Sequence, residues 1–379
     1  MYRDHIVGVV VPAYNEEGRV GDVVRELPAS VDAIVLVDDA STDGTWLEMG
    51  DLMDGAVEGR RPLRTAPAAA GGVPGGTEAR DRQAERRRPD GDGRVNVLES
   101  RLAEAETAGK VTRLRHRENR GAGGAIKTGY LEALARGVDV VVTIDGDGQM
   151  DASQMSTVLD PVVTGQAGYA KGNRFADVDV VREMPPFRLV GNLLLTALTR
   201  ISSGYWGLSD PQNGFTAISR DALRRTDIAT MWEYYGYMNQ LVARLNAAGV
   251  RVADVPMPTT YSDEISDIEY PQYIRRVSTL LLVSFGRRVW TKYSHPRALP
   301  VPVGYVAGGL LVATTLLRKL RSRIASGDTS WSDAVTGVAL GAVVFVAAAI
   351  GDGVAEPTVV DVDEKRELAP TPDATGRSE

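Results

Sequence analysis

Short apolar runs separated by polar and glycine-rich stretches fill the first 260 residues of the chain. These runs are rich in β-branched side chains and show little polar alternation, which is typical of strands buried on both faces of a parallel sheet. They lie at residues 6–11, 33–37, 111–114 and 140–144. After the first run, apolar residues recur at helical spacing up to Leu27. Strands that alternate with helices predict an α/β domain with a mostly parallel sheet.

Two longer uncharged runs follow near the C-terminus, at residues 298–317 and 334–350. Each has about the length that crosses a bilayer, so we predict a transmembrane hairpin over residues 298–352. Two buried core helices are the alternative, because the runs are rich in glycine and alanine and the second is short. Basic residues flank the first run on both sides, so the positive-inside rule gives no orientation.

The remaining segments differ in composition. We expect a folded domain over residues 1–260, interrupted at 55–93 by a disordered insertion rich in Gly, Pro, Ala and Arg. An interfacial helix region at 261–297 and a disordered acidic tail at 353–379 complete the organisation. No basic and then apolar leader opens the chain, so the folded domain is expected to stay cytoplasmic, at the cell membrane.

Charge and composition narrow the function classes. The formal net charge is -7 and no basic stripe offsets it, which argues against nucleic-acid binding. The chain contains no cysteine, so disulfides, thiol nucleophiles and cysteine-ligated metals are excluded. With only three histidines, a histidine metal cluster is not expected either.

Two carboxylates follow the fourth apolar run, in the stretch Asp145-Gly146-Asp147-Gly148-Gln149. Ligands of open α/β sheets gather at the carboxyl ends of the strands. Flanking glycines let the chain turn so that Asp145, Asp147 and the Gln149 amide converge on one hard cation. The stretch therefore predicts a divalent metal site. A capping role is the alternative, although Asp151 is better placed to cap the next helix.

Two further stretches carry candidate chemistry. Asp38 and Asp39 follow the second apolar run, where Asp39 suits a base edge or a ribose and an Asx-turn is the alternative. A glycine-rich turn within residues 119–130 opens a helix, whose free N–H groups and positive dipole end favour phosphate. A tight turn without a ligand is an equal alternative for these glycines.

Six segments in the same order together resemble family 2 of the nucleotide-sugar glycosyltransferases, and within it the polyprenyl-phosphate group typified by dolichol-phosphate mannose synthase. The resemblance covers residues 6 to about 290 and implies the GT-A fold. The segments are residues 11–16, 37–45, 119–130, 145–149, 172–175 and 210–215.

This resemblance implies roles for the matched residues. The donor would be a GDP- or UDP-hexose, with Mg²⁺ or Mn²⁺ on its diphosphate. The residues predicted to bind the donor are Pro12, Tyr14, Glu16, Asp39, Gly121 and Lys127. The predicted metal ligands are Asp145, Asp147 and Gln149. Arg174 would contact phosphate, with a surface ion pair as the alternative. The predicted catalytic residues are Asp145, Asp147, Arg174 and Arg188.

The acceptor is predicted from a missing carboxylate. Relatives that glycosylate a hydroxyl need a carboxylate base, and the resemblance places that region at residues 237–240, where the chain has Asn239 and Gln240. A phosphate is already an anion and needs no base, which fits dolichyl or polyprenyl phosphate. Apolar helices opening near Pro186 and Tyr270 carry arginines that would catch lipid phosphate at the headgroup layer, and Arg188 is the best acceptor candidate.

The sequence therefore predicts a metal-dependent, inverting glycosyltransferase that transfers a single hexose to a polyprenyl phosphate at the membrane. The alternatives are a transferase acting on a lipid hydroxyl and a catalytically silent, membrane-anchored binding protein. A sugar-1-phosphate nucleotidyltransferase would need a basic, glycine-rich loop after the first strand, which Pro12-Ala13-Tyr14-Asn15-Glu16 does not provide. Whether the chain forms a homo-oligomer is left open.

Overall fold

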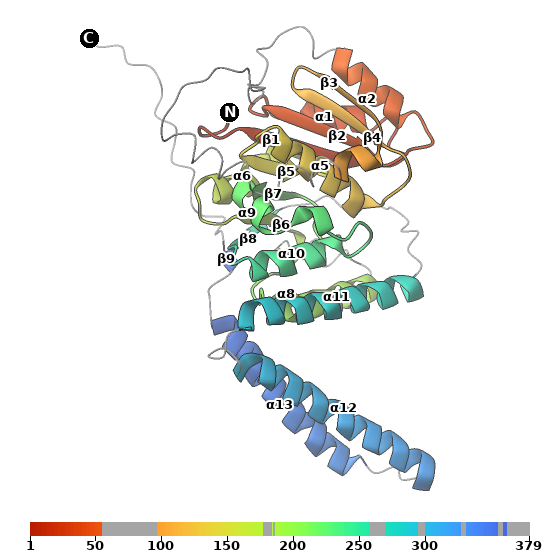
Figure 1. Cartoon of the computed structure of the whole chain (residues 1–379), viewed down its shortest axis with the longest axis vertical. Helices are drawn as coiled ribbons and strands as arrows, with labels where there is room; N and C mark the ends of the chain where they lie inside the picture. Colours follow the sequence, from red (N-terminus) through yellow and green to blue (C-terminus); the bar gives the residue numbers. More distant parts are fainter. Residues whose placement is uncertain are drawn as a thin grey trace, which may run out of the picture.

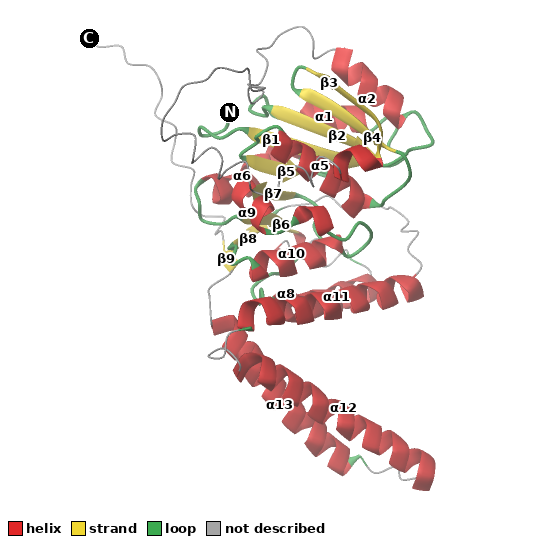
Figure 2. Ribbon diagram, in the orientation of Figure 1, coloured by secondary structure: helices red, strands yellow, loops and turns green. Residues whose placement is uncertain are grey.

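One sheet of nine strands organises the structure, a computed structural model (Figure 2). The structure describes residues 1–54, 97–176, 184, 186–257, 270–294, 300–326, 331–354 and 359–361. The strands are β1 (Val7–Ala13), β2 (Ala33–Asp38), β3 (Leu102–Ala108), β4 (Val111–His116), β5 (Val140–Thr143), β6 (Tyr169–Asn173), β7 (Thr216–Ser219), β8 (Val252–Pro256) and β9 (Val359–Asp361). Their order across the sheet is β3-β4-β2-β1-β5-β7-β6-β8-β9.

Most neighbouring strands run parallel, which confirms the predicted α/β class. β1 pairs in parallel with β2 and β5, and β2 with β4, while β6, β8 and β9 form a second parallel group. β7 joins the two groups by antiparallel pairing with β5 and β6, and β3 is antiparallel at the edge. The carboxyl ends of β1, β2 and β5 therefore meet at one edge of the sheet.

Helices cover both faces of this sheet (Figure 1). Seven consecutive residues of β1 are buried because alternate side chains enter two different cores, with Val9 and Val11 in one and Val10 in the other. The first core includes side chains of α1 (Val20–Glu26), α2 (Thr45–Asp54) and α6 (Met155–Val163). The second includes side chains of α5 (Ala122–Ala135), α9 (Arg220–Arg225) and α10 (Tyr237–Ala247).

Both edge strands differ from the sequence prediction. β3 is charged and mostly exposed, so no hydrophobic run marked it. β9 lies in the segment predicted as a disordered tail, and that prediction is wrong for these three residues because they pair in parallel with β8. The insertion predicted at 55–93 lies outside the described residues.

Two helices separate the sheet from the C-terminal hairpin (Figure 1). α8 (Pro186–Ser203) and α11 (Tyr270–Tyr293) pack together and against α10. Beyond them, α12 (Pro300–Ser326) and α13 (Ser332–Val354) pair along their length and extend away from the sheet.

The hairpin is long and apolar enough to cross a membrane. Its candidate spans are Pro300–Ala325, with a mean hydropathy of 1.6, and Ala334–Gly353, with a mean hydropathy of 2.3. Only 11% and 22% of these segments are buried within the protein. A pair of core helices would be mostly covered, so these values favour the predicted hairpin over two buried core helices.

A buried ion pair attaches the hairpin to the rest of the chain. Asp352, in the last turn of α13, accepts hydrogen bonds from Arg288 Nη2 at 2.7 Å, Arg288 Nη1 at 3.0 Å and the Tyr305 hydroxyl at 3.0 Å, and also from Tyr293. Arg288 Nε donates to the Ser202 carbonyl of α8. The sequence prediction that the arginines of the helix opening near Tyr270 catch lipid phosphate is wrong for Arg288, because this residue is only 1% exposed and Asp352 compensates its charge.

Replacing this buried carboxylate tests the attachment. We expect Asp352→Asn to lower the free energy of unfolding by roughly 3–5 kcal/mol, because Arg288 would keep a buried charge without a counter-ion. Thermal unfolding of the full chain in detergent measures the change. Asp51→Asn, an exposed site on α2, serves as the control and should have little effect. Equal unfolding temperatures for the two variants would contradict the anchoring role.

Candidate active site

A cavity of about 540 Å³ lies at the carboxyl ends of β1, β2 and β5. Its wall brings together seven residues that the sequence selected at separate positions: Pro12, Tyr14, Glu16, Asp39, Gly121, Asp145 and Asp147. A smaller adjoining cavity of about 330 Å³ shares the two aspartates and adds Gln149 and Arg174. The sheet therefore collects most of the predicted site at one edge, as parallel strands require.

Asp39 is the buried carboxylate at one end of the larger cavity. Its Oδ1 atom accepts a hydrogen bond from the backbone N–H of Arg120 at 2.8 Å and lies 2.6 Å from His116 Nδ1. His116 Nε2 lies 2.8 Å from the Thr128 hydroxyl of α5. Sequence reasoning missed His116. This residue ends β4, which pairs with β2, and Asp39 directly follows β2.

The neighbouring Asp38 has the turn role that was the alternative for both residues. It accepts a hydrogen bond from the backbone of Ser41 at 2.9 Å and pairs with Arg115 Nε at 3.1 Å. Asp151 likewise caps the short helix after the acid pair, as predicted, by accepting a hydrogen bond from the backbone of Ser153. These contacts leave Asp39 as the acid of this cluster that lines the cavity.

The acid pair lies where the two cavities meet. Burial, reinforced by the charges of Asp147 and Glu16, raises the pKa of Asp145 to about 7. A Cβ atom at Gly214 would lie 2.7 Å from Asp145 Oδ2, so a larger residue at this position would displace the carboxylate. Repelling carboxylates in a recess are offset by a bound cation, and hard oxygen donors suit Mg²⁺ or Mn²⁺.

The donor set for such an ion is small. Within the described residues, no group of three His, Cys, Asp or Glu side chains is placed to hold a metal. Asp145 and Asp147 with the exposed Gln149 give two carboxylates and one amide, which leaves coordination positions for a diphosphate and water. The residues present thus fit a cation that arrives with a phosphorylated ligand.

Arg174 forms an ion pair with a buried acid. Its Nε lies 2.7 Å from Asp210 Oδ2 and its Nη2 lies 3.2 Å from Asp210 Oδ1. Burial opposes ionisation of Asp210, but the Arg174 charge outweighs it and holds the pKa of Asp210 below its usual range. Arg174 still lines the smaller cavity, whereas the side chain of Arg188 lies outside the described residues and its role stays a prediction.

The glycine-rich start of α5 is closed by protein. The N–H of Gly124 donates a hydrogen bond to the Glu233 carbonyl at 2.8 Å. A Cβ atom at Gly123 would lie 2.8 Å from the carbonyl oxygens of both Trp232 and Glu233. These two glycines therefore admit the loop of residues 231–236, and this close approach accounts for glycine at both positions.

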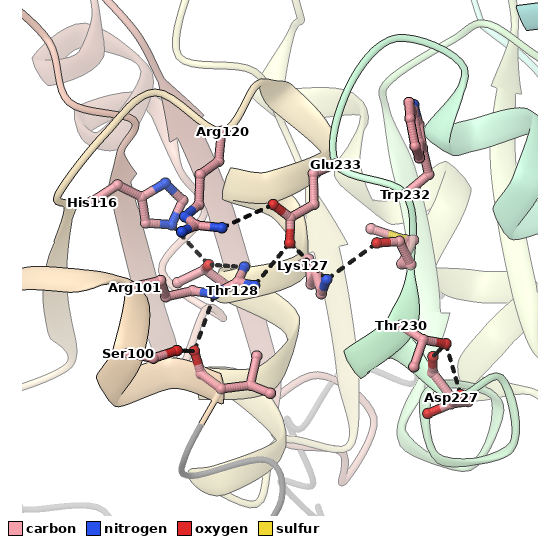
Figure 3. A network of polar contacts seen from close by, with 12 residues as sticks. Ser100, Arg101, His116, Arg120, Lys127, Thr128, Asp227, Thr230, Trp232 and Glu233 are labelled. Carbon is pink, nitrogen blue, oxygen red and sulfur yellow. Dashed lines mark hydrogen bonds and ion pairs between the residues drawn. The ribbon is translucent and has the colours of Figure 1, made fainter. Parts of the chain in front are cut away.

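The same loop is fixed by a charged network around Glu233 (Figure 3). The Glu233 carboxylate accepts hydrogen bonds from Lys127 Nζ at 2.7 Å, Arg101 Nη2 at 2.8 Å and Arg120 Nη1 at 3.2 Å. Burial favours the neutral acid, but the Lys127 hydrogen bond and the Arg101 charge outweigh it and lower the pKa of Glu233 to about 2.

Lys127 consequently points away from the role predicted for it. Its buried ammonium group contacts Glu233 and the Met231 carbonyl, and it is not among the residues that line the larger cavity. Sequence reasoning missed the loop that it holds, from which Tyr234, Tyr235 and Gly236 line the cavity.

Carboxylates at the carboxyl edge of a mostly parallel sheet, beside a cavity of this size, are typical of the ligand site of an α/β protein. The chain belongs to glycosyl transferase family 2, whose model matches residues 8–64 and 92–226. It is therefore a glycosyltransferase with the GT-A fold, as the sequence predicted.

Two relatives with named activities are similar to this chain over about two thirds of its length. UDP-N-acetylglucosamine–dolichyl-phosphate N-acetylglucosaminyltransferase of Methanococcus voltae is 26% identical over 261 residues, covering 69% of this chain and 88% of the relative. Undecaprenyl-phosphate mannosyltransferase of Micrococcus luteus is 28% identical over 257 residues, covering 65% and 81%. The crystal structure of glucosyl-3-phosphoglycerate synthase from Mycobacterium tuberculosis with UDP aligns with a TM-score of 0.45 and 21% identity, covering 75% and 81%.

Replacing Glu233 tests the network. At pH 6 we expect Glu233→Gln to lower the free energy of unfolding by roughly 2–4 kcal/mol, because three cations lose their counter-charge. A carboxylate whose pKa is lower in the folded state than in the unfolded state stabilises the fold at pH values above the unfolded pKa of about 4.3. This stabilisation is lost as the pH falls towards the folded pKa of about 2. Thermal unfolding at pH 6 and pH 3 should therefore show a smaller difference between wild type and variant at the lower pH.

The matched control for this experiment is Glu118→Gln. Glu118 also pairs with Arg120, at 2.9 Å, but its side chain is 70% exposed. Exposed pairs contribute little, so this variant should unfold like the wild type at both pH values. A Glu233→Gln variant as stable as Glu118→Gln at pH 6 would refute the proposed network.

Proposed function

We propose that this glycosyltransferase moves a single hexose from a nucleotide-diphosphate sugar to dolichyl or polyprenyl phosphate, with inversion at the anomeric carbon and with Mg²⁺ or Mn²⁺ on the donor. One observation carries the proposal: a single cavity is lined by Asp39 at the end of β2 and by Asp145 and Asp147 after β5. A nucleotide-diphosphate sugar has a nucleoside at one end, the sugar at the other and the charged diphosphate between them, so Asp39 can meet the nucleoside while the acid pair faces the diphosphate.

The nucleoside half would bind beside Asp39. This carboxylate is oriented by Arg120 and His116, so it can accept hydrogen bonds from a base edge or a ribose without first rearranging. Tyr14 is 46% exposed and lines the same cavity, where its ring offers an apolar surface to the nucleoside. Pro12, Glu16 and Gly121 complete the wall around this half.

The diphosphate half would face the acid pair. Asp145 and Asp147, with Gln149, would hold the cation, which when bound acts as a Lewis acid on the charge of the departing diphosphate. Arg174 contributes fixed positive charge nearby, and the effect of that charge on Asp145 is to lower its pKa against burial. Asp210 fixes the guanidinium plane of Arg174 through two contacts and so limits its reorientation.

The acceptor side of the cavity favours a phosphate. Its wall includes residues 234–238, which carry no acidic side chain. The acid on the same loop, Glu233, is bound to three cations and has a pKa of about 2, which makes it a poor base. An acceptor phosphate already carries the negative charge needed for attack, and both relatives above are named for polyprenyl-phosphate substrates.

The hairpin supplies the membrane side of the proposal. α12 and α13 have the length and hydropathy to cross a bilayer, and α8 and α11 lie between them and the sheet (Figure 1). Exposed leucines of α8, Leu193 and Leu194, add apolar surface at this level. A lipid acceptor that stays in the membrane would thus meet a catalytic domain held at the membrane surface.

Substituting the acid pair tests the donor site. We expect Asp147→Ala to lower kcat roughly 100-fold or more without lowering the unfolding temperature, because charge stabilisation at the leaving group is lost while a repulsion with Asp145 is relieved. Transfer of labelled sugar in detergent measures kcat. Asp151→Asn, a nearby carboxylate that caps the next short helix, should retain activity. Full activity in the presence of a metal chelator would reject the metal-dependent mechanism.

Product chemistry tests the acceptor. We expect membranes containing the protein, incubated with labelled UDP- or GDP-sugars and dolichyl phosphate, to yield a labelled lipid that mild acid cleaves, since a sugar phosphodiester is acid-labile. A labelled lipid that resists mild acid would identify a hydroxyl acceptor instead. Absence of any nucleotide-sugar turnover across the panel would favour the silent binding protein.

A further inference from the structure

A separate cavity of about 190 Å³ lies between α10 and α11. It shares no lining residue with the donor cavity. Four arginines contribute to its wall: Arg225, Arg244, Arg287 and Arg288. A recess lined by so many cations, in a chain whose net charge is negative, calls for an anionic ligand.

Three of these arginines have partners within the protein. Arg225 pairs with Asp221, and Arg288 pairs with Asp352. Arg244 donates to the Asp227 carbonyl at 2.9 Å and to the Thr230 carbonyl and hydroxyl, while the Asp227 carboxylate, which also lines the cavity, accepts from Thr230. The cavity is therefore only partly compensated by its own acids.

Arg287 is the exception. Across the described segments it has no hydrogen-bond or ion-pair partner, and its side chain is exposed at the cavity. Burial, and then the charge of Arg287, lowers the pKa of Arg244, so the two cations repel each other across the recess. An anion bound between them would remove this repulsion.

Two unused donors lie in the same wall. The Ser284 hydroxyl and Arg244 Nε are buried, and no hydrogen-bond partner for either lies in the part of the chain that the structure describes. Ser284 is 7% exposed and directly follows Val283 on α11, three residues ahead of Arg287. Buried donors without acceptors are costly, and an oxyanion is the acceptor that serves several donors at once.

Apolar side chains adjoin this recess. Val283, Arg287 and Trp290 follow one another at helical spacing and so share a face of α11, where Val283 is 60% and Trp290 77% exposed. α11 also contacts α12, the first helix of the hairpin. Arginine and tryptophan on one helix face beside membrane helices are typical of the bilayer interface.

We propose that this cavity binds the phosphate of an anionic membrane phospholipid, with its acyl chains against Val283 and Trp290. The inference rests on the membrane attachment in the proposed function and not on the transfer reaction. A soluble phosphate compound would use the same donors but would gain nothing from the exposed apolar residues beside them. Bound lipid would thereby set the depth and tilt of the catalytic domain at the membrane.

Lipid titration of the delipidated full chain in detergent tests this proposal. Calorimetry with short-chain phosphatidylglycerol should give saturable binding, whereas phosphatidylcholine of the same chain length should bind at least about tenfold more weakly because its headgroup carries a cation. Glycerol phosphate, the headgroup fragment without acyl chains, should also bind at least about tenfold more weakly. Glycerol phosphate binding as tightly as the lipid would overturn the lipid assignment.

Variants locate the binding. Arg287→Gln, alone and combined with Ser284→Ala, should raise the Kd for phosphatidylglycerol about tenfold or more, since a charge-assisted hydrogen bond is lost. Arg276→Gln, which removes an exposed arginine of the same helix outside the cavity, is the matched control and should leave the Kd unchanged. An unchanged Kd in Arg287→Gln would overturn the site.

These readings are independent of catalysis. Arg287 is exposed, so its single variant keeps the fold, and its unfolding temperature checks this directly. Transfer of sugar in detergent should be unaffected by Arg287→Gln. If the protein failed to glycosylate any polyprenyl phosphate, the lipid titration would still be readable, because it requires no turnover.

Discussion

The Glu233 network joins the two sides of the donor cavity. Arg120 contributes its backbone N–H to Asp39 and its guanidinium to Glu233, so the residue predicted to meet the nucleoside and the loop proposed to face the acceptor share one support. Arg101 extends the network to Thr128, whose hydroxyl also contacts His116. Because every member is a hydrogen-bonded polar group in a partly buried setting, the network behaves as a unit. The shape of the cavity therefore depends on charges that never touch the cavity itself.

In the acid pair of Asp145 and Asp147, which lines the same cavity as Asp39, the like charges repel each other. Asp145 lies among like charges in a recess, an arrangement that costs stability when no cation is present. The fold tolerates it because the surrounding strands are buried on both faces and are held by extensive backbone pairing. Functional sites often lower the stability of a fold, and here the loss is confined to two side chains, Asp145 and Asp147, which follow one strand.

The parts of this picture that are local in sequence could be predicted. The buried strands, the acid pair and Asp39 all follow from apolar runs that end in polar residues, and strand order then brings them together. Lys127 could not be assigned correctly, because its partner Glu233 lies 106 residues away and no pattern links the two. Arg288 was misassigned for a similar reason, since Asp352 is 64 residues distant. β3 and β9 were not predicted, because edge strands need no buried apolar face and so need leave no long hydrophobic run in the sequence.

The position of β9 in the sheet has a topological consequence for the hairpin. The chain leaves the sheet after β8, runs through α11, α12 and α13, and then returns to pair with β8 itself. Because β8 and β9 pair with each other, the segments before and after the hairpin of α12 and α13 lie on the same side of any membrane that the hairpin crosses. In the proposed membrane arrangement, reporter groups fused before β1 and after β9 would therefore face the same aqueous phase. Because β8 precedes the hairpin and β9 follows it, the pairing of these two strands connects both ends of the hairpin to the sheet.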